Sequence, residues 1–184
     1  MLETLPLAER RAGLAEVIKH GLIANIPELW NPAHLTALTP EIIARAIQVK
    51  VDVVARDPYE KHERAFLNLG HTFAHAIEAV STYSWRHGEA VAVGLIGAAR
   101  LSHALGLCDS TLADQLEEAL QTVGLPTAYR DYSPVALRAA MGTDKKRQAG
   151  RVRFVLLRAP GELLMRDDVP EEMVLHVLES LKTP

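Results

Sequence analysis

Five polar residues in an otherwise apolar stretch of the sequence are spaced so that they could act together. They are Arg64, Asn68, His71, His75 and Glu78. At 3.6 residues per turn, this spacing places all five on one face of an α-helix. We therefore predict a single, mostly buried helix from Arg64 to Val80, with its polar line facing a cavity. Because these groups are costly to bury without partners, the line is a candidate active-site wall.

Histidines and a carboxylate suggest a metal site. His71 and His75 alone are a weak indication, since such a pair is more often two hydrogen-bonded polar residues. His87 strengthens the case because it begins the most apolar helix of the chain, and Glu16 offers a carboxylate within another largely apolar segment. One carboxylate, two imidazoles and an open position are the donor set of a catalytic zinc site. Such an ion would polarise a hydroxyl or carbonyl oxygen.

Three cationic residues indicate what kind of ligand the site could bind. Lys19 follows Glu16 by one helical turn, Lys50 lies between two valines, and Arg64 begins the polar line. Taken singly, each is more simply a side chain that extends to a solvated face. Several cations converging beside a metal ion would instead suit an anionic substrate, such as a phosphate or carboxylate ester.

Helical patterns dominate the segments that must position these groups. Besides the helix at 64–80, we predict helices at 7–24, 40–56, 87–105, 110–124 and 170–181, and a short one from 134. Thr39 is the expected N-cap of the second helix, with Pro40 at its first position, whereas Pro27 and Pro32 mark a loop. The alternating segments 151–158 and 162–166 predict a β-hairpin. The expected fold is mainly α, a multi-helix bundle with a small β-hairpin.

Composition excludes several classes of protein. The chain has 184 residues and a net charge of −3, and its only tight basic cluster is 145–147, so we expect no nucleic-acid partner. A single cysteine, Cys108, excludes an internal disulfide and a cysteine-rich metal site. The longest apolar run, 90–99, is about half the length of a membrane span. Since charges also interrupt the N-terminus early, we expect a cytoplasmic protein without membrane contact.

Four ordered motifs resemble the 3-dehydroquinate synthase family. They are AGLAEVIK at 12–19, LNLGHTFAHAIE at 67–78, HGEAVAVG at 87–94, and Asp144-Lys145-Lys146 followed by the strand at 152–157. Together they run from the first residues almost to the end of the chain. Two positions depart from the family pattern: His20 stands where tyrosine is usual, and Ala74 where glycine is usual.

The resemblance implies roles for individual residues. Glu16, His71 and His87 match the family's ligands for Zn²⁺ (or Co²⁺). The implied substrate-binding residues are Lys19, Lys50, Arg64, Asn68, His75 and either Lys146 or Lys145. Among them, His75, Lys19 and Asn68 are the implied catalytic residues, with His75 assisting proton transfer.

The resemblance also implies a reaction and a missing part. The family converts 3-deoxy-D-arabino-heptulosonate 7-phosphate to 3-dehydroquinate and phosphate, a carbon–oxygen lyase step of the shikimate pathway to aromatic amino acids. Bound NAD transiently oxidises a ring hydroxyl, but the sequence has no glycine-rich dinucleotide motif. We therefore expect residues 1–184 to form only the C-terminal metal- and substrate-binding domain, without the N-terminal NAD-binding domain and inactive alone.

Two other functions remain open at this point. The chain could be half of a related sugar-phosphate cyclase, or a non-catalytic protein that keeps the metal site. The expected ligand is an anionic sugar phosphate in each enzymatic case. The expected macromolecular partner is either a separate NAD-binding domain or a second copy in a homodimer.

Overall fold

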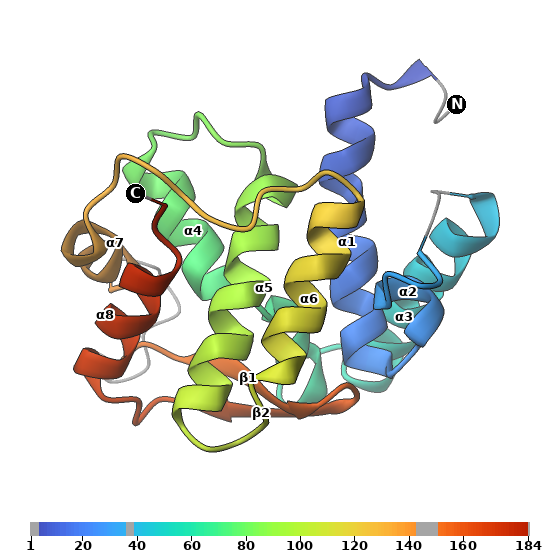
Figure 1. The fold of residues 1–184 in the computed structure, drawn as a ribbon. Coiled ribbons are helices and arrows are strands. Elements are labelled where there is room, and N and C mark those ends of the chain that lie inside the picture. Colours follow the sequence, from blue (N-terminus) through green and yellow to red (C-terminus); the bar gives the residue numbers. More distant parts are fainter. Residues whose placement is uncertain (1–3, 36–38, 143–150, 184) are drawn as a thin grey trace.

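One buried helix, α5 (His87–Ala104), forms the centre of the molecule in the computed structural model, which describes residues 4–35, 39–142 and 151–183. Every residue from 90 to 99 is buried, which accounts for the long apolar run in the sequence. Helix α4 (His71–Val80) packs on one side of α5, and α1 (Leu7–Ala24) and α6 (Thr111–Thr122) lie on the other (Figure 1). The apolar run is therefore the core of a helical bundle.

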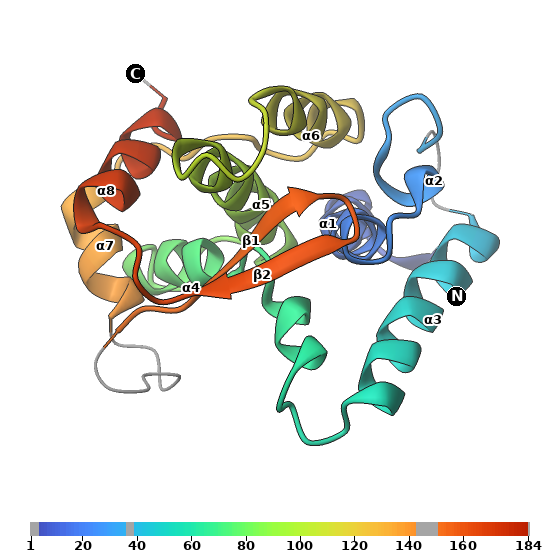
Figure 2. The ribbon, with the colours of Figure 1, turned by 90° about the horizontal axis from the view of Figure 1, so that it is seen from below.

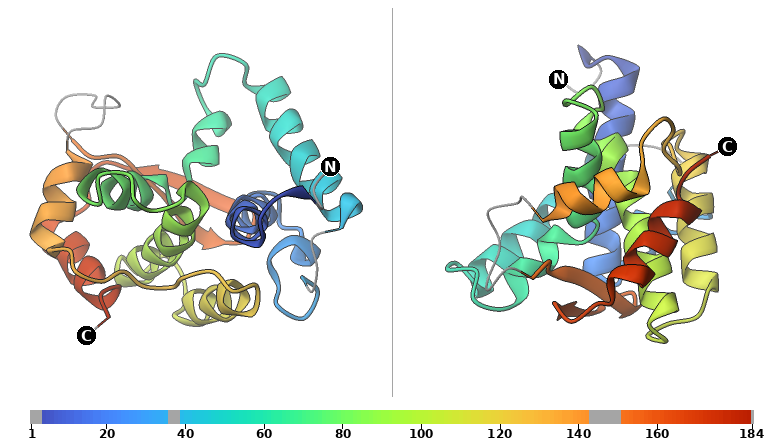
Figure 3. Two further views of the ribbon diagram at one scale, coloured as in Figure 1. Left: turned by 90° about the horizontal axis from the view of Figure 1, so that it is seen from above. Right: turned by 90° about the vertical axis from the view of Figure 1, so that its left-hand side faces the viewer.

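The remaining elements surround this centre. Helices α7 (Pro134–Met141) and α8 (Glu171–Ser180) pack together beyond α4, and α2 (Pro27–Trp30) follows α1. The antiparallel strands β1 (Phe154–Ala159) and β2 (Glu162–Arg166) form the hairpin, which crosses one end of the bundle (Figure 2). Helix α3 (Pro40–Arg56) and the 3-10 helix η2 (Glu63–Asn68) project together from one side (Figure 3). The mainly α fold with a β-hairpin is thus confirmed.

Local sequence patterns correctly predicted where several helices begin and end. Helices α1 and α3 have the predicted bounds, and Thr39 Oγ1 accepts a hydrogen bond from the Ile42 amide at 3.3 Å, as an N-cap should. The expected loop at Pro27 is wrong, because this proline occupies the first turn of α2. In the described part of the chain, no helix is long and apolar enough to cross a membrane.

The prediction of one helix from Arg64 to Val80 is also wrong. The chain forms η2, turns at Gly70 with a φ of 78°, and starts α4 at His71. A Cβ atom at Gly70 would lie 2.9 Å from the Leu95 amide nitrogen of α5, so the backbones touch here. This contact between elements, which periodicity does not reveal, divides the polar line into two parts with different axes.

Two glycines of α5 let neighbouring helices approach closely. A Cβ atom at Gly88 would lie 1.9 Å from the Ala12 carbonyl oxygen of α1. A Cβ atom at Gly94 would lie 2.2 Å from the Gly70 carbonyl oxygen, just before α4. Since these neighbours are backbone atoms, no change of side-chain rotamer could make room. Both positions therefore require glycine for packing.

We expect Gly94→Ala to lower the free energy of unfolding by about 1–3 kcal/mol, because the added methyl group overpacks a rigid contact. The matched control is Gly13→Ala in α1, where an added Cβ meets nothing within 4 Å. That variant should be more stable than the wild type by up to about 1 kcal/mol, since alanine favours a helix. Urea denaturation measures both, and equal stability of Gly94→Ala and wild type would contradict the packing argument.

Candidate metal centre and adjoining cavity

Three helices each bring one side chain of a type that can ligate a metal to the same point. Glu16 comes from α1, His71 is the first residue of α4, and His87 is the first residue of α5. One ligand atom from each lies within 4.8 Å of the other two. Glu16 Oε1 is 3.7 Å from His71 Nε2 and 3.8 Å from His87 Nε2, beyond hydrogen-bonding distance. The arrangement suits one shared ion, which small side-chain movements would let all three atoms contact.

The two oxygens of Glu16 have different surroundings. Oε2 accepts a hydrogen bond from Lys19 Nζ at 2.6 Å. Oε1 is buried and has no hydrogen-bond partner among the described residues. Burial alone would raise the pKa of Glu16, but Lys19 and the neighbouring imidazoles hold it below its usual value, so the carboxylate is ionised. An unpartnered, buried, negatively charged oxygen is costly, and a cation is the partner that fits it.

Both histidines are oriented through their other ring nitrogen. His71 Nδ1 lies 3.1 Å from the Leu69 carbonyl oxygen, and His87 Nδ1 lies 2.9 Å from Glu78 Oε1. These oxygens accept hydrogen bonds, so each Nδ1 donates and each Nε2 keeps its lone pair for a metal. Burial and the charge of Lys19 lower the pKa of His71 to about 4, which keeps this ring neutral.

Glu78 was present in the polar line of the sequence, but no role was predicted for it. Its carboxylate holds His87, which lies on the next helix. Its spacing from His71 and His75, which puts all three on one face of α4, was the sequence pattern that could have indicated a role for Glu78. What periodicity could not supply is the approach of α5, which brings His87 to that face.

His75 lies beside the three-residue cluster rather than in it. Its ring packs edge-on against the His71 ring, with the centroids 5.5 Å apart, and its centroid is 6.5 Å from that of His87. The structure therefore places His75, one of the residues predicted to act on the substrate, next to the candidate metal position.

A polar cavity of about 490 Å³ opens at the candidate metal centre. Of the residues predicted to bind substrate, Lys19, Lys50, Arg64 and Asn68 line it. Lys145 and Lys146 lie outside the described residues. Glu60 and His20 also line the cavity, although neither was predicted to be functional. Glu60 has a φ of 54° in the loop after α3, where no periodic pattern could have indicated it.

A buried carboxylate shapes that loop. Asp57 accepts hydrogen bonds from the backbone amides of Lys61, His62 and Arg64. Burial would raise the pKa of Asp57, but these three donors hold it below its usual value. The Arg64 guanidinium donates to the Pro58 carbonyl oxygen at 2.7 Å. Asp57 thereby fixes the turn that brings both Glu60 and Arg64 to the cavity.

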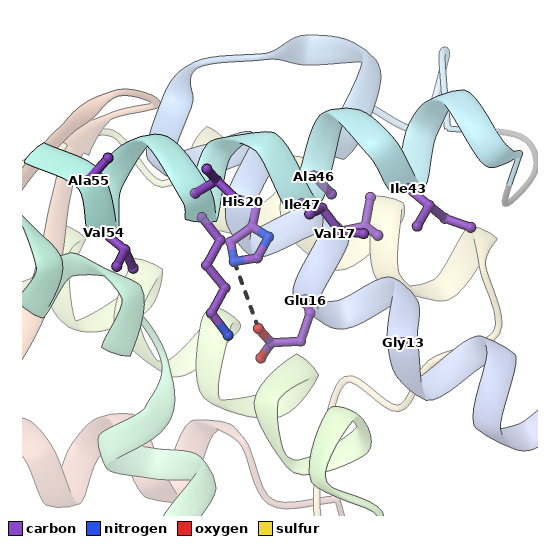
Figure 4. Close-up of a pocket in the computed structure, with 11 residues that line it drawn as sticks. Gly13, Glu16, Val17, His20, Ile43, Ala46, Ile47, Val54 and Ala55 are labelled. Atoms are coloured by element: carbon purple, nitrogen blue, oxygen red, sulfur yellow. Dashed lines mark ion pairs between the residues drawn. The ribbon is translucent and has the colours of Figure 1, made fainter. Parts of the chain in front are cut away.

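A second, mostly apolar groove of about 770 Å³ lies between α1 and α3 (Figure 4). It shares Glu16, His20, Lys50 and Val54 with the polar cavity, so the two spaces adjoin. The side chain of His20 stands at this boundary, beside Glu16.

Comparisons with known sequences agree on one family. A sequence model of the family described as "3-dehydroquinate synthase C-terminal" matches residues 13–147. The 3-dehydroquinate synthase of Xanthomonas campestris pv. campestris (strain 8004) is 47% identical, with 96% of this chain and 52% of that protein covered. The enzyme of Corynebacterium jeikeium is 45% identical, with 95% and 49% covered. This chain thus spans about half the length of these relatives.

Solved structures share the fold. A 2-epi-5-epi-valiolone synthase from Streptomyces hygroscopicus subsp. jinggangensis, with NAD⁺ and Zn²⁺ bound, has a TM-score of 0.80 at 23% identity. Its match covers 97% of this chain and 52% of that protein. A 2-deoxy-scyllo-inosose synthase with carbaglucose-6-phosphate, NAD⁺ and Co²⁺ has a TM-score of 0.78 at 23% identity, with 96% and 53% covered.

The geometry predicts a graded loss of zinc affinity. His87→Ala should abolish tight binding, because two remaining protein ligands seldom hold the ion. Glu78→Ala should weaken binding about 10–100-fold, since it removes only the group that orients His87. The control is His176→Ala, an exposed position on α8. Competition with a chromophoric chelator measures all four proteins, and wild-type affinity in His87→Ala would contradict the assignment.

Proposed function

The chain belongs to the 3-dehydroquinate synthase family, and on that premise we propose that it is the metal- and substrate-binding half of a 3-dehydroquinate synthase. The reaction would convert 3-deoxy-D-arabino-heptulosonate 7-phosphate to 3-dehydroquinate and phosphate, as in the shikimate pathway. The observation that carries the proposal is the meeting of the Glu16, His71 and His87 donors with three cationic side chains at one cavity.

We assign the metal to those three donors, as Zn²⁺ or Co²⁺. The unpartnered Oε1 of Glu16 and the two oriented Nε2 atoms support this assignment. When bound, the ion would supply Lewis-acid polarisation of a substrate hydroxyl or carbonyl oxygen. Lys19, held at 2.6 Å from Glu16 Oε2, would keep that carboxylate turned so that Oε1 faces the metal position.

The cations of the cavity suit the two anionic groups of the proposed substrate. Lys19 and Lys50 approach from α1 and α3, and Arg64 approaches from η2. A carboxylate and a phosphate would each find a positively charged partner within this polar space. The cavity of about 490 Å³ is of the size that small-molecule sites have. We therefore assign these three residues to substrate binding.

The neutral side chains complete the proposed assignments. Asn68 lines the cavity and would hydrogen-bond a substrate hydroxyl. His75, whose ring packs against that of His71, would hold or transfer a proton beside the reacting groups. Either Lys145 or Lys146, which lie outside the described residues, would also reach the substrate.

The transient oxidation needs NAD, which we assign to a domain other than the one described. The relatives are about twice as long as the matched region, and both fold relatives named above hold NAD⁺. The alternative of a related sugar-phosphate cyclase is supported by likeness of fold at 23% identity. Identities of 45–47% to 3-dehydroquinate synthases favour our first assignment.

Phosphate release tests the function. The zinc-loaded chain with NAD should release no phosphate from the heptulosonate phosphate. A chimera that joins the other half of the X. campestris enzyme to this chain should release it, and the same chimera with His87→Ala should not. Phosphate release by the chain alone would contradict the assignment of NAD binding to another domain. A folded chimera that releases no phosphate would contradict the assigned reaction.

Arg64→Ala should bind zinc normally but bind inorganic phosphate and the heptulosonate phosphate about 10–100-fold more weakly, because a charge-assisted hydrogen bond is lost. The control is Arg45→Ala on α3, since Arg45 lines neither cavity. Calorimetric titration measures both ligands. Unchanged affinities in Arg64→Ala would return this residue to the role of an ordinary surface cation.

A further inference from the structure

Asp57 is a buried carboxylate that binds the backbone of the turn after α3. Only 6% of its surface is exposed. Its Oδ1 accepts a hydrogen bond from the Lys61 amide at 2.9 Å, and its Oδ2 accepts from the amides of His62 at 2.7 Å and Arg64 at 3.1 Å. Hydrogen bonds to an ionised acceptor are stronger than those between neutral groups. Both oxygens of this carboxylate are therefore used to hold one turn.

The turn needs such support because it contains a strained residue. Glu60 has a φ of 54°, in the left-handed region that residues with a side chain rarely adopt. Its amide donates to the Asp57 carbonyl oxygen at 3.3 Å. A strained backbone conformation persists only where the surrounding structure fixes it. The Asp57 carboxylate, which binds amides directly after Glu60, is the group that does so here.

The same turn keeps the charges of Asp57 and Arg64 apart. An aspartate and an arginine this close in the chain could neutralise each other, but Asp57 binds the backbone amide of Arg64 instead of its guanidinium. The guanidinium donates through Nη1 to the Pro58 carbonyl oxygen at 2.7 Å and lines the polar cavity. It forms no ion pair with any carboxylate in the described part of the chain. Its charge and its other N–H donors are therefore available to an anion.

We propose that Asp57 is a positioning residue for anion binding, because it holds the backbone of Arg64 in place and leaves the guanidinium unpaired at the cavity. The inference rests on the proposed function and deepens it, since it names the group that determines how Arg64 meets the anionic part of the substrate. A cation that is held in place before binding loses less conformational freedom on binding than one in a mobile loop.

The possible effects of Asp57 on a bound anion differ in sign. If the carboxylate acted through its charge alone, removing it would tighten the binding of phosphate, because two negative charges repel each other. If it acts by positioning Arg64, removing it weakens the binding of phosphate. A purely structural role would lower the stability of the fold and leave the phosphate affinity of the folded protein unchanged.

The test measures the affinity of the zinc-loaded chain for inorganic phosphate, without NAD. Asp57→Ala should bind phosphate about 3–10-fold more weakly. Asp57→Asn, which keeps one acceptor oxygen, should lie between Asp57→Ala and the wild type. In an Arg64→Ala background, Asp57→Ala should cause no further loss, because no guanidinium remains to be positioned. Zinc affinity should be unchanged in every variant.

The matched control is Asp52→Ala, which removes the same charge from an exposed position on α3 and should not weaken phosphate binding. Calorimetric titration measures the affinities, and thermal unfolding checks that each variant folds. Unchanged or tighter phosphate binding in a folded Asp57→Asn would overturn the inference. So would an equal loss from Asp57→Ala with and without Arg64.

Hydrogen exchange in the wild-type chain decides the case in which neither Asp57 variant folds. The amides of His62 and Arg64 should be protected before phosphate is added and should gain no protection on binding, because the turn is already in place. A gain on addition of phosphate would overturn the inference. A wild-type chain that binds inorganic phosphate but not the heptulosonate phosphate would contradict the proposed function alone, and one that binds neither would contradict both.

Discussion

Direct backbone contact between α5 and its two neighbours is the constraint on which the rest of the structure depends. Gly88 meets Ala12 of α1, and Gly94 meets Gly70 just before α4. Each contact lies next to, or one turn from, a residue of the candidate metal centre: His87 precedes Gly88, His71 follows Gly70, and Glu16 is one turn beyond Ala12. Interiors are packed too densely for such contacts to shift freely. The glycines at these points therefore set where the side chains of the candidate metal centre meet.

Within that frame, the donors of the candidate metal centre each have one atom held by the protein and another directed at the shared point. Glu16 illustrates this arrangement, since Lys19 neutralises one oxygen while the other remains without a partner. The histidines follow the same rule, because one nitrogen of each ring is used by the protein and the other faces the shared point. A protein built only for stability would have no reason to leave the buried Oε1 of Glu16 without a partner.

The sequence predicted the parts of this design that depend on local chemistry. Thr39 and Pro40 fix the start of α3 through capping, and the apolar run of α5 predicts a buried helix, whatever surrounds them. The polar residues of the 64–80 segment were recognised from their spacing, but their arrangement was not. Gly70 breaks that segment because of a contact with α5, and Glu60 reaches the cavity because Asp57 folds its loop. Both depend on residues distant in space or in a non-repeating loop, which periodicity does not detect.

The spread of the three donors along the chain has a consequence for folding. Glu16, His71 and His87 belong to three separate helices. The elements α2, α3 and η2, with the loops that join them, lie between the first donor and the second. An ion held by all three would act as a cross-link, fastening α1 to the rest of the bundle much as a disulfide closes a long loop. Because such an ion binds the native chain in preference to the unfolded one, it adds about 4 kcal/mol of stability when its free concentration is a thousandfold above its dissociation constant. In this molecule, loss of the metal ion would then impair both the chemistry of the site and the stability of the fold.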